Sequence, residues 1–275
     1  MRRAAGAVVA MAISATVALA DGGDPIPRLE RLLEGLDATL VVYERGADRR
    51  TRIDPERAAR RYSPCSTFKI PNSLIGLETG VIAGPDILVD YDEAEHPRPS
   101  GQSDRRHAVL AQPHTLRTAL ANSVVWYYQE LAEQVGAKTM GEYLERFDYG
   151  NQDISAGIDV FWLSKTLRIS ADEQIGFLQK FYDGKLASDR STEIVKEILV
   201  LEQNGDATLS AKTGSGWGDD GRPLGWWVGY VENGDDIAFF AFNLQADSWD
   251  ELLANRVNRC RRALQILGLI GEESE

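Results

Sequence analysis

The sequence predicts an α/β fold of the α+β type, with a five-stranded antiparallel sheet flanked by terminal helices and an inserted all-helical lobe. Strand patterns, which are short runs of β-branched and apolar residues, occur only toward the two ends of the chain. Apolar residues in the stretch between them recur at helical spacing. Two early and three late strands can form one sheet, and the helical stretch then forms a second lobe. Clefts form at such lobe boundaries, so we expect the functional site there.

The early elements begin with a helix over 27–36, where leucines recur at helical spacing. Strands follow over 38–43 and 50–53, and Gly46-Ala47-Asp48 turns the chain between them. A helix over 66–79 then starts as the chain leaves the sheet, and a glycine ends it. The start of this helix therefore lies at the predicted boundary between the lobes.

The middle of the chain is first polar and then helical. Residues 90–113 are rich in proline and histidine and predict a loop. Ser170 and Glu173 have the spacing of a capping box, which predicts the start of a helix. The helices predicted in this part cover 116–121, 124–135, 139–147, 170–182 and 192–201.

The last part of the chain returns to strand patterns. Asn233-Gly234 predicts a hairpin turn between the last two strands. The strands predicted here cover 207–213, 225–231 and 237–245, and a closing helix covers 249–267. We place the sheet lobe at about 21–65 and 202–275, and the helical lobe at about 66–201.

The first twenty residues are predicted to be a signal peptide, so that residues 21–275 form the mature domain. Arg2 and Arg3 supply a positive start, a run of small and apolar residues follows, and Ala18-Leu19-Ala20 fits a cleavage site. An uncleaved membrane anchor is disfavoured because the apolar run is short. The formal net charge of −12 becomes −14 without the two arginines. Such acidity disfavours binding to nucleic acid and to anionic membranes.

The cysteines and histidines do not predict a metal site. Cys65 and Cys260 could pair in an oxidising compartment, but we expect two free and largely buried thiols. The chain has no Cys-x-x-Cys, and its three histidines lack the spacing of zinc ligands. We therefore expect no metal.

Ser66-Thr67-Phe68-Lys69 is the first of four short motifs that carry the functional prediction. A serine and a lysine three positions apart share one face of a helix, so the amine can take the hydroxyl proton. Alone, this tetrad is more often a solvated pair on a surface helix. It is followed in order by Ser123-Val124-Val125, Tyr149-Gly150-Asn151 and Lys212-Thr213-Gly214.

These four motifs, with intervals of 57, 26 and 63 residues between their first positions, make the chain resemble the class D serine β-lactamases, the oxacillinase family. Phe161-Trp162-Leu163 and the helix around Gln174 also match that family. The resemblance covers 29–270 and implies the fold shared by serine β-lactamases and penicillin-binding transpeptidases.

The resemblance implies a role for each residue of the first motifs. Ser66 would be the acylated nucleophile, and Lys69, as an N6-carboxylysine made with carbon dioxide or bicarbonate, would be the general base. Ser123 would relay a proton to the leaving nitrogen, although a serine at a break between helices is also an ordinary helix cap. Val125, Trp162 and Leu163 would form an apolar pocket for the carbamate, with the Trp162 N–H as a donor, although plain core packing is an alternative for 161–163. No other cofactor is implied.

The remaining motif residues would hold the substrate. Lys212, Thr213 and Gly214 would border it, Gly214 by letting it approach closely, and the backbone N–H groups of Ser66 and Ser215 would form an oxyanion hole. Arg256 would bind the substrate carboxylate, with Arg259 as the competing candidate and a plain surface arginine as the alternative for either. Tyr149 and Asn151 would shape the cleft wall, although a turn after a helix explains them equally well.

The function implied is hydrolysis of penicillin- and cephalosporin-type antibiotics in the bacterial periplasm, conferring resistance. One alternative is a β-lactam sensor or penicillin-binding domain that is acylated without efficient turnover. A penicillin-binding peptidase is disfavoured by the small size of the chain, and a metal-dependent lactamase by its few histidines. The partner would be a small β-lactam, and the sequence leaves open whether the protein is a monomer or a homodimer.

Overall fold

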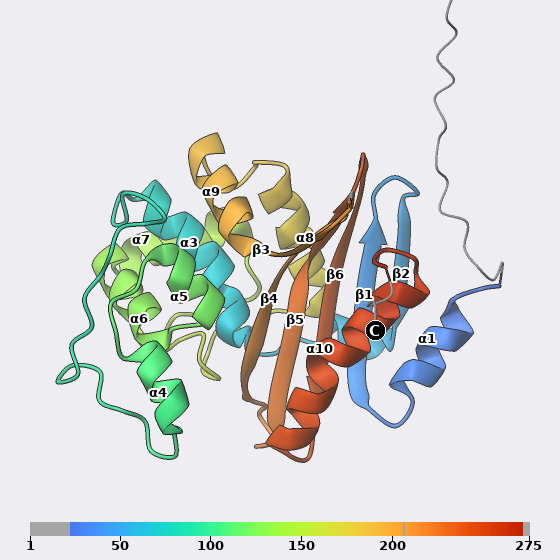
Figure 1. Ribbon diagram of the computed structural model, residues 1–275, viewed down its shortest axis with the longest axis horizontal. Helices are drawn as coiled ribbons and strands as arrows, with labels where there is room; N and C mark the ends of the chain where they lie inside the picture. The colour runs from blue at the N-terminus through green and yellow to red at the C-terminus, as the bar shows by residue number, and fades with distance from the viewer. Residues whose placement is uncertain (1–22, 206, 272–275) are drawn as a thin grey trace, which may run out of the picture.

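The computed structural model describes residues 23–205 and 207–271, which fold around one antiparallel sheet (Figure 1). Its strand order is β2-β1-β6-β5-β4-β3. The strands are β1 (Asp37–Glu44), β2 (Arg49–Ile53), β3 (Val200–Asn204), β4 (Ala207–Trp217), β5 (Pro223–Asn233) and β6 (Asp236–Gln245). The predicted five strands are all present, and β3 is a sixth.

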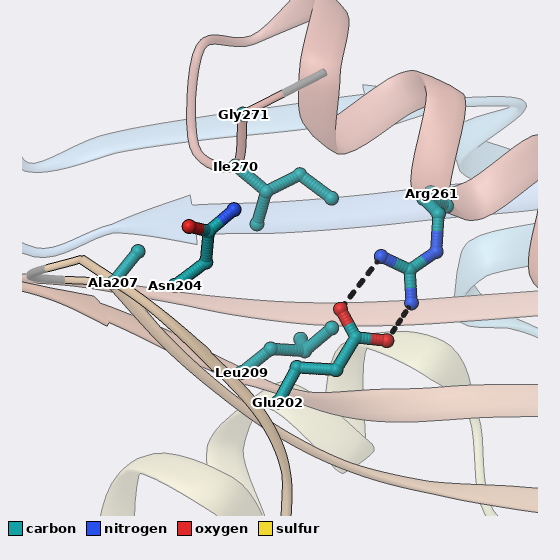
Figure 2. A pocket seen from close by; sticks show the side chains of 7 residues that line it. All are labelled: Glu202, Asn204, Ala207, Leu209, Arg261, Ile270 and Gly271. Carbon is teal, nitrogen blue, oxygen red and sulfur yellow. Dashed lines mark hydrogen bonds and ion pairs between the residues drawn. The ribbon is translucent and has the colours of Figure 1, made fainter. Parts of the chain in front are cut away.

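Strand β3 corrects the prediction of a helix that continues to residue 201. Helix α9 (Asp189–Leu199) ends because Val200 leaves the helical conformation, with φ −58° and ψ 125°. All five residues of β3 are exposed, so the strand has no alternation of buried and exposed positions by which sequence could reveal it. Glu202 pairs with Arg261 of the closing helix, and a small pocket beside this pair contains none of the predicted site residues (Figure 2).

All eight predicted helices are present, with ends shifted by a few residues. They are α1 (Ile26–Leu33), α3 (Lys69–Glu78) after a 3-10 turn η1 (Cys65–Phe68), α5 (Leu116–Asn122), α6 (Val125–Val135), α7 (Ala137–Phe147), α8 (Ala171–Tyr182), α9 and α10 (Trp249–Ile266). The capping box at Ser170 and Glu173 is confirmed. The hairpin between β5 and β6 is also confirmed, although Asn233 pairs with Asp236, so that its central residues are Gly234 and Asp235.

Two further helices were not predicted. Helix α2 (Pro55–Ala59) begins after Asp54, whose side chain accepts a hydrogen bond from the Arg57 N–H. Helix α4 (Asp104–Leu110) lies inside the predicted loop 90–113, which is therefore wrong in part. Leu110 packs against the core, but no residue of α4 is buried, so this short helix has no periodic apolar face that would reveal it in the sequence.

The sheet is covered on both faces. Helices α1 and α10 lie on one side, and helices α3 to α9 gather on the other side and beyond it (Figure 1). Alternating residues of β6 show the two cores: Phe239 and Ala241 join the core of the helical side, whereas Phe240 and Phe242 pack under α1 and α10. Both faces of the central strands are thus buried.

Part of β4 is left without a neighbour on its outer edge. Strand β3 pairs with β4 only through Ala207–Ser210, whereas β5 pairs with β4 along its whole length to Trp217. The segment from Ala211 to Trp217 therefore has one free edge, and η1 packs against β4. This places the Ser66 turn beside the Lys212-Thr213-Gly214 segment.

The predicted signal peptide over 1–20 lies outside the described residues. Within 23–205 and 207–271, no helix has both the length and the apolar composition needed to cross a bilayer. Cys65 and Cys260 are both buried and free, as expected.

Replacing Gly229 should test how closely β5 must approach β4. A Cβ at residue 229 would lie 2.1 Å from the Ser210 backbone oxygen, so Gly229→Ala must move one strand. We expect a loss of about 1–3 kcal/mol in the free energy of unfolding, measured in urea by tryptophan fluorescence. Gly176→Ala is the control, since nothing lies within 4 Å of its added Cβ in helix α8. Equal unfolding free energies of the two variants would show that β5 does not have to approach β4 so closely at residue 229.

Candidate functional site

Ser66 and Lys69 meet at the junction between η1 and α3. The Lys69 amine donates a hydrogen bond of 3.0 Å to the Ser66 hydroxyl. Cys65, just before the serine, has φ +49°, a left-handed conformation that a residue with a side chain adopts at a cost. The Thr67 hydroxyl donates to Pro64 O and accepts from Gln174 Nε2, which holds the turn on its other side. The structure thus places hydroxyl and amine as the sequence predicted.

The Lys69 amine has no carboxylate partner among the described residues. The side chain is completely buried, and burial lowers the pKa of Lys69 to about 7, with repulsion from Arg106 acting in the same direction. The amine lies 5.1 Å from the centre of the Tyr128 ring. A large fraction of Lys69 is therefore neutral near pH 7, which is the form that accepts a proton or reacts as a nucleophile.

Trp162 supplies an unused donor close to this turn. Its ring stacks on Phe68 with centroids 5.4 Å apart, and it is fully buried. The indole N–H has no hydrogen-bond partner in the described structure. An unsatisfied buried donor is destabilising, so this one points to an acceptor that binds there. Val125 and Leu163 are only partly buried.

Ser123 and Lys212 form the second hydroxyl–amine pair. Lys212 Nζ donates to Ser123 Oγ at 3.2 Å and to the Thr213 carbonyl at 3.1 Å. Ser123 ends helix α5 in a left-handed conformation with φ 54°. Burial, with repulsion from Lys69, Arg256 and Arg106, lowers the pKa of Lys212 well below its ordinary value. The helix-cap and proton-relay interpretations of Ser123 are compatible.

The free edge of β4 presents backbone donors toward the Ser66 turn. The Trp217 N–H points outward from this edge and donates to Ser164 Oγ at 2.7 Å. Since N–H direction alternates along a strand, the Ser215 N–H points the same way. Ser215 therefore has the orientation that an oxyanion hole requires.

Arg256, and not Arg259, reaches this edge from helix α10. One guanidinium nitrogen of Arg256 donates to the Gly214 carbonyl at 3.1 Å and also to Ser215 Oγ. Burial lowers the pKa of Arg256, and its Nε has no partner in the described structure. Arg259 instead contacts Asn255 and the Leu32 carbonyl. The geometry favours Arg256 as the anion-binding arginine.

Gly214 was expected to let a substrate approach closely, but the structure gives another reason for a glycine at this position. A Cβ there would lie 2.8 Å from Pro64 O and 3.1 Å from Thr67 Cγ2. The space that the missing side chain leaves is thus filled by the η1 turn and not open to a substrate. Gly216 is similar, since a Cβ would meet Cys65 Sγ at 2.6 Å. These glycines bring β4 against the nucleophile turn.

Tyr149 and Asn151, predicted to shape the cleft wall, lie behind the nucleophile turn and beside the segment 166–168. Tyr149 is fully buried, with its ring centroid 5.6 Å from that of Phe68. Asn151 is bonded to the segment 166–168, donating to Thr166 O at 2.9 Å and accepting from the Arg168 N–H at 2.8 Å. A Cβ at Gly150 would clash with Arg168 O at 2.0 Å. This motif supports the site from behind.

Ser63 and Ser164 belong to the site but were not predicted, because a serine outside a motif cannot be recognised as functional from sequence. Ser63 donates to Trp162 O at 2.9 Å and accepts from the Ser164 N–H at 3.0 Å. The Ser63 carbonyl accepts from the indole of Trp226 at 2.8 Å. With the Ser164–Trp217 bond, these contacts connect the Trp162 loop to the edge of β4.

The fold also brings together one group of side chains able to hold a metal, Glu95, His96 and Glu130, in the described part of the chain. His96 Nε2 lies 2.8 Å from a Glu130 oxygen, which an ordinary histidine–glutamate pair explains. Sequence spacing did not show this group, because a loop and helix α6 contribute to it. It shares no residue with the Ser66 site.

Comparison with known proteins gives a consistent match. The family model described as the penicillin binding protein transpeptidase domain matches residues 43–259. The chain is 46% identical over 198 residues to β-lactamase OXA-48 of Klebsiella pneumoniae, covering 72% of this chain and 71% of that one. It is 39% identical to β-lactamase OXA-10 of Pseudomonas aeruginosa, covering 86% and 87%. The solved class D β-lactamase FUS-1 of Fusobacterium nucleatum superposes with a TM-score of 0.81 at 34% identity, covering 89% and 99%.

Removing the Ser63 hydroxyl should disturb the Trp162 loop. Ser63→Ala leaves Trp162 O without its donor and the Ser164 N–H without its acceptor, so we expect a loss of about 1–3 kcal/mol in unfolding free energy and slower turnover. Thermal unfolding and steady-state kinetics measure both. Ser100→Ala is the matched control, since Ser100 is exposed. Unchanged kinetics in Ser63→Ala would show that the Trp162 loop does not need the hydrogen bonds of the Ser63 hydroxyl to keep its active conformation.

Proposed function

The chain belongs to the class D β-lactamase family, and we propose that it hydrolyses the β-lactam amide of penicillin- and cephalosporin-type antibiotics through an acyl-enzyme on Ser66. It is a hydrolase by this membership. The observation that carries the proposed mechanism is the 3.0 Å contact between Ser66 and a buried Lys69 whose pKa is about 7. A neutral amine so placed can react with carbon dioxide, and the resulting carbamate would accept the hydroxyl proton as Ser66 attacks the lactam carbonyl.

The backbone would stabilise the oxygen that becomes negative in this attack. The donors are the N–H groups of Ser66 and Ser215, which belong to the nucleophile turn and to the free edge of β4. The contact of η1 with β4 at Gly214 supports this pairing, because it brings both segments together. Fixed backbone donors need little reorganisation during the reaction, which makes them effective.

A carbamate on Lys69 fits the residues around this amine. The neutral form of Lys69 supports its formation from carbon dioxide, and the unpaired Trp162 N–H offers a donor for it. When present, the carbamate supplies a carboxylate-like general base for acylation and for water attack. The partly buried Val125 and Leu163 would limit water at this position.

The leaving nitrogen would receive its proton through Ser123. The Lys212–Ser123 contact of 3.2 Å supports this, because an amine that donates to the hydroxyl leaves the hydroxyl proton free to move. Arg256 would bind the substrate carboxylate beside Thr213 and Ser215. Its Nε, unpaired in the described structure, supports that role.

We also propose secretion to the bacterial periplasm, on the strength of the leader-like sequence over 1–20. A sensor that is acylated without turnover uses the same nucleophile, and only kinetics separates the two functions. Sustained turnover of a chromogenic cephalosporin supports the hydrolase. A single burst that stalls, even with bicarbonate, supports the sensor.

Replacing Lys69 should stop turnover at the acyl-enzyme. Lys69→Ala removes the base, so we expect hydrolysis of a penicillin to fall by at least about a hundredfold, the usual worth of a general base. Intact-mass spectrometry should then show covalent adduct on the protein. Lys165→Ala is the control, since that side chain is exposed. Near-normal hydrolysis by Lys69→Ala would overturn the mechanism.

Acid and removal of bicarbonate should each lower activity. The pKa of Lys69 is about 7, so the amine is neutral above that pH and protonated below it. Only the neutral form becomes carbamylated, and we expect activity to fall as pH drops from 8 to 5. Degassed buffer should lower the rate near neutral pH, and added bicarbonate should restore it. Rates that do not depend on bicarbonate at any pH would contradict carbamylation of Lys69. They would not contradict the acyl-enzyme on Ser66.

A further inference from the structure

The Ser66 site gathers basic side chains without a matching acid. Lys69, Lys212 and Arg256 surround it, and no aspartate or glutamate of the described chain acts on any of the three. A fourth cation, Arg106, acts by repulsion on both lysines. This concentration stands out in a chain with a formal net charge of −12. The lowered pKa values of the two lysines reduce their charge, whereas guanidinium groups stay protonated, so the arginines are the lasting cations beside the site.

Arg106 reaches the site from helix α4. Its guanidinium Nη2 donates to the Asn122 carbonyl at 2.8 Å, directly before Ser123. The residue is exposed, and no acidic side chain pairs with it in the described structure. The guanidinium therefore lies beside the serine that faces Lys212, with further N–H groups available to a ligand.

The proposed substrate orientation determines which group would face Arg106. In the proposed orientation the lactam nitrogen would lie toward Ser123, next to the Asn122 carbonyl that binds Arg106, and the ring carboxylate toward Arg256 at the β4 edge. The remaining positions on the ring fused to that nitrogen would then lie on the side of α4. A cephalosporin carries its C3 substituent on this ring.

We propose that Arg106 is a specificity-determining residue that binds an anionic substituent on the ring fused to the lactam nitrogen. This proposal rests on the proposed hydrolase function. The alternative is that Arg106 only holds α4 to the Asn122 carbonyl, in which case the charge of the substrate substituent has no effect.

The test compares two cephalosporins that share one acyl side chain. Both carry a tetrazolylthiomethyl group at C3, with an N-methyl group in one and an N-sulfomethyl group in the other. They therefore differ by a single negative charge. We expect kcat/KM for the anionic compound relative to the neutral one to fall by about two- to fivefold in Arg106→Gln, the range of a partly exposed ion pair.

Three controls define the origin of this change. Arg106→Lys keeps the charge and should keep most of the preference. Arg105→Gln removes the same charge from the adjacent exposed residue and should leave the ratio unchanged. Raising the ionic strength should reduce the preference of the wild type but not the ratio in Arg106→Gln.

The outcomes separate this proposal from the hydrolase function. Hydrolysis of the neutral compound by wild type and by Arg106→Gln supports the function whatever the ratio does. A ratio that is equal in wild type and Arg106→Gln overturns the proposal, as does an equal change in Arg105→Gln. If neither compound is hydrolysed, the hydrolase function itself fails, and acylation rates by mass spectrometry give the ratio.

Discussion

The burial of one amine governs the rest of the site. Lys69 is fully enclosed, and a charged ammonium in such surroundings is costly unless it is paired. Because burial lowers the pKa of Lys69 to about 7 and no acid in the described chain pairs with it, a large fraction of the amine is neutral near pH 7. Phe68, Tyr128 and Trp162 enclose the amine or its turn, so the aromatic core sets the chemistry as well as the stability.

The site is positioned by backbone geometry more than by its charged residues. Cys65 and Ser123 both adopt left-handed conformations next to or at reactive positions, and Ser164 does so where it accepts from the edge of β4. Strain of this kind persists only where surrounding packing enforces it. Here the enforcing contacts are the close approach of β4 to η1 at Gly214 and the bonds of Ser63.

Sequence predicted the elements with an extended buried surface and missed short or exposed ones. Strand β6 is buried on both faces as a continuous apolar run, and helix α8 buries one periodic face, whereas β3 is exposed along its length and α4 has no buried residue. In the site, Ser66 with Lys69 could be expected because their spacing itself creates the contact. Ser63, Ser164 and the position of Tyr149 depend on segments about a hundred residues apart meeting in space. The spacing of residues along the chain does not predict contacts between segments so far apart in the sequence.

The free edge of β4 has a consequence for how this protein meets other chains. An unpaired edge is usually a hazard, since it offers a ready template for another chain to add as a strand. Here β3 covers the first residues of β4, and the η1 turn packs against the strand at Gly214. Farther along, the Trp217 N–H already donates to Ser164 Oγ. The edge is thus interrupted by local contacts along its length, so it does not offer a second chain the continuous row of backbone groups that strand addition needs.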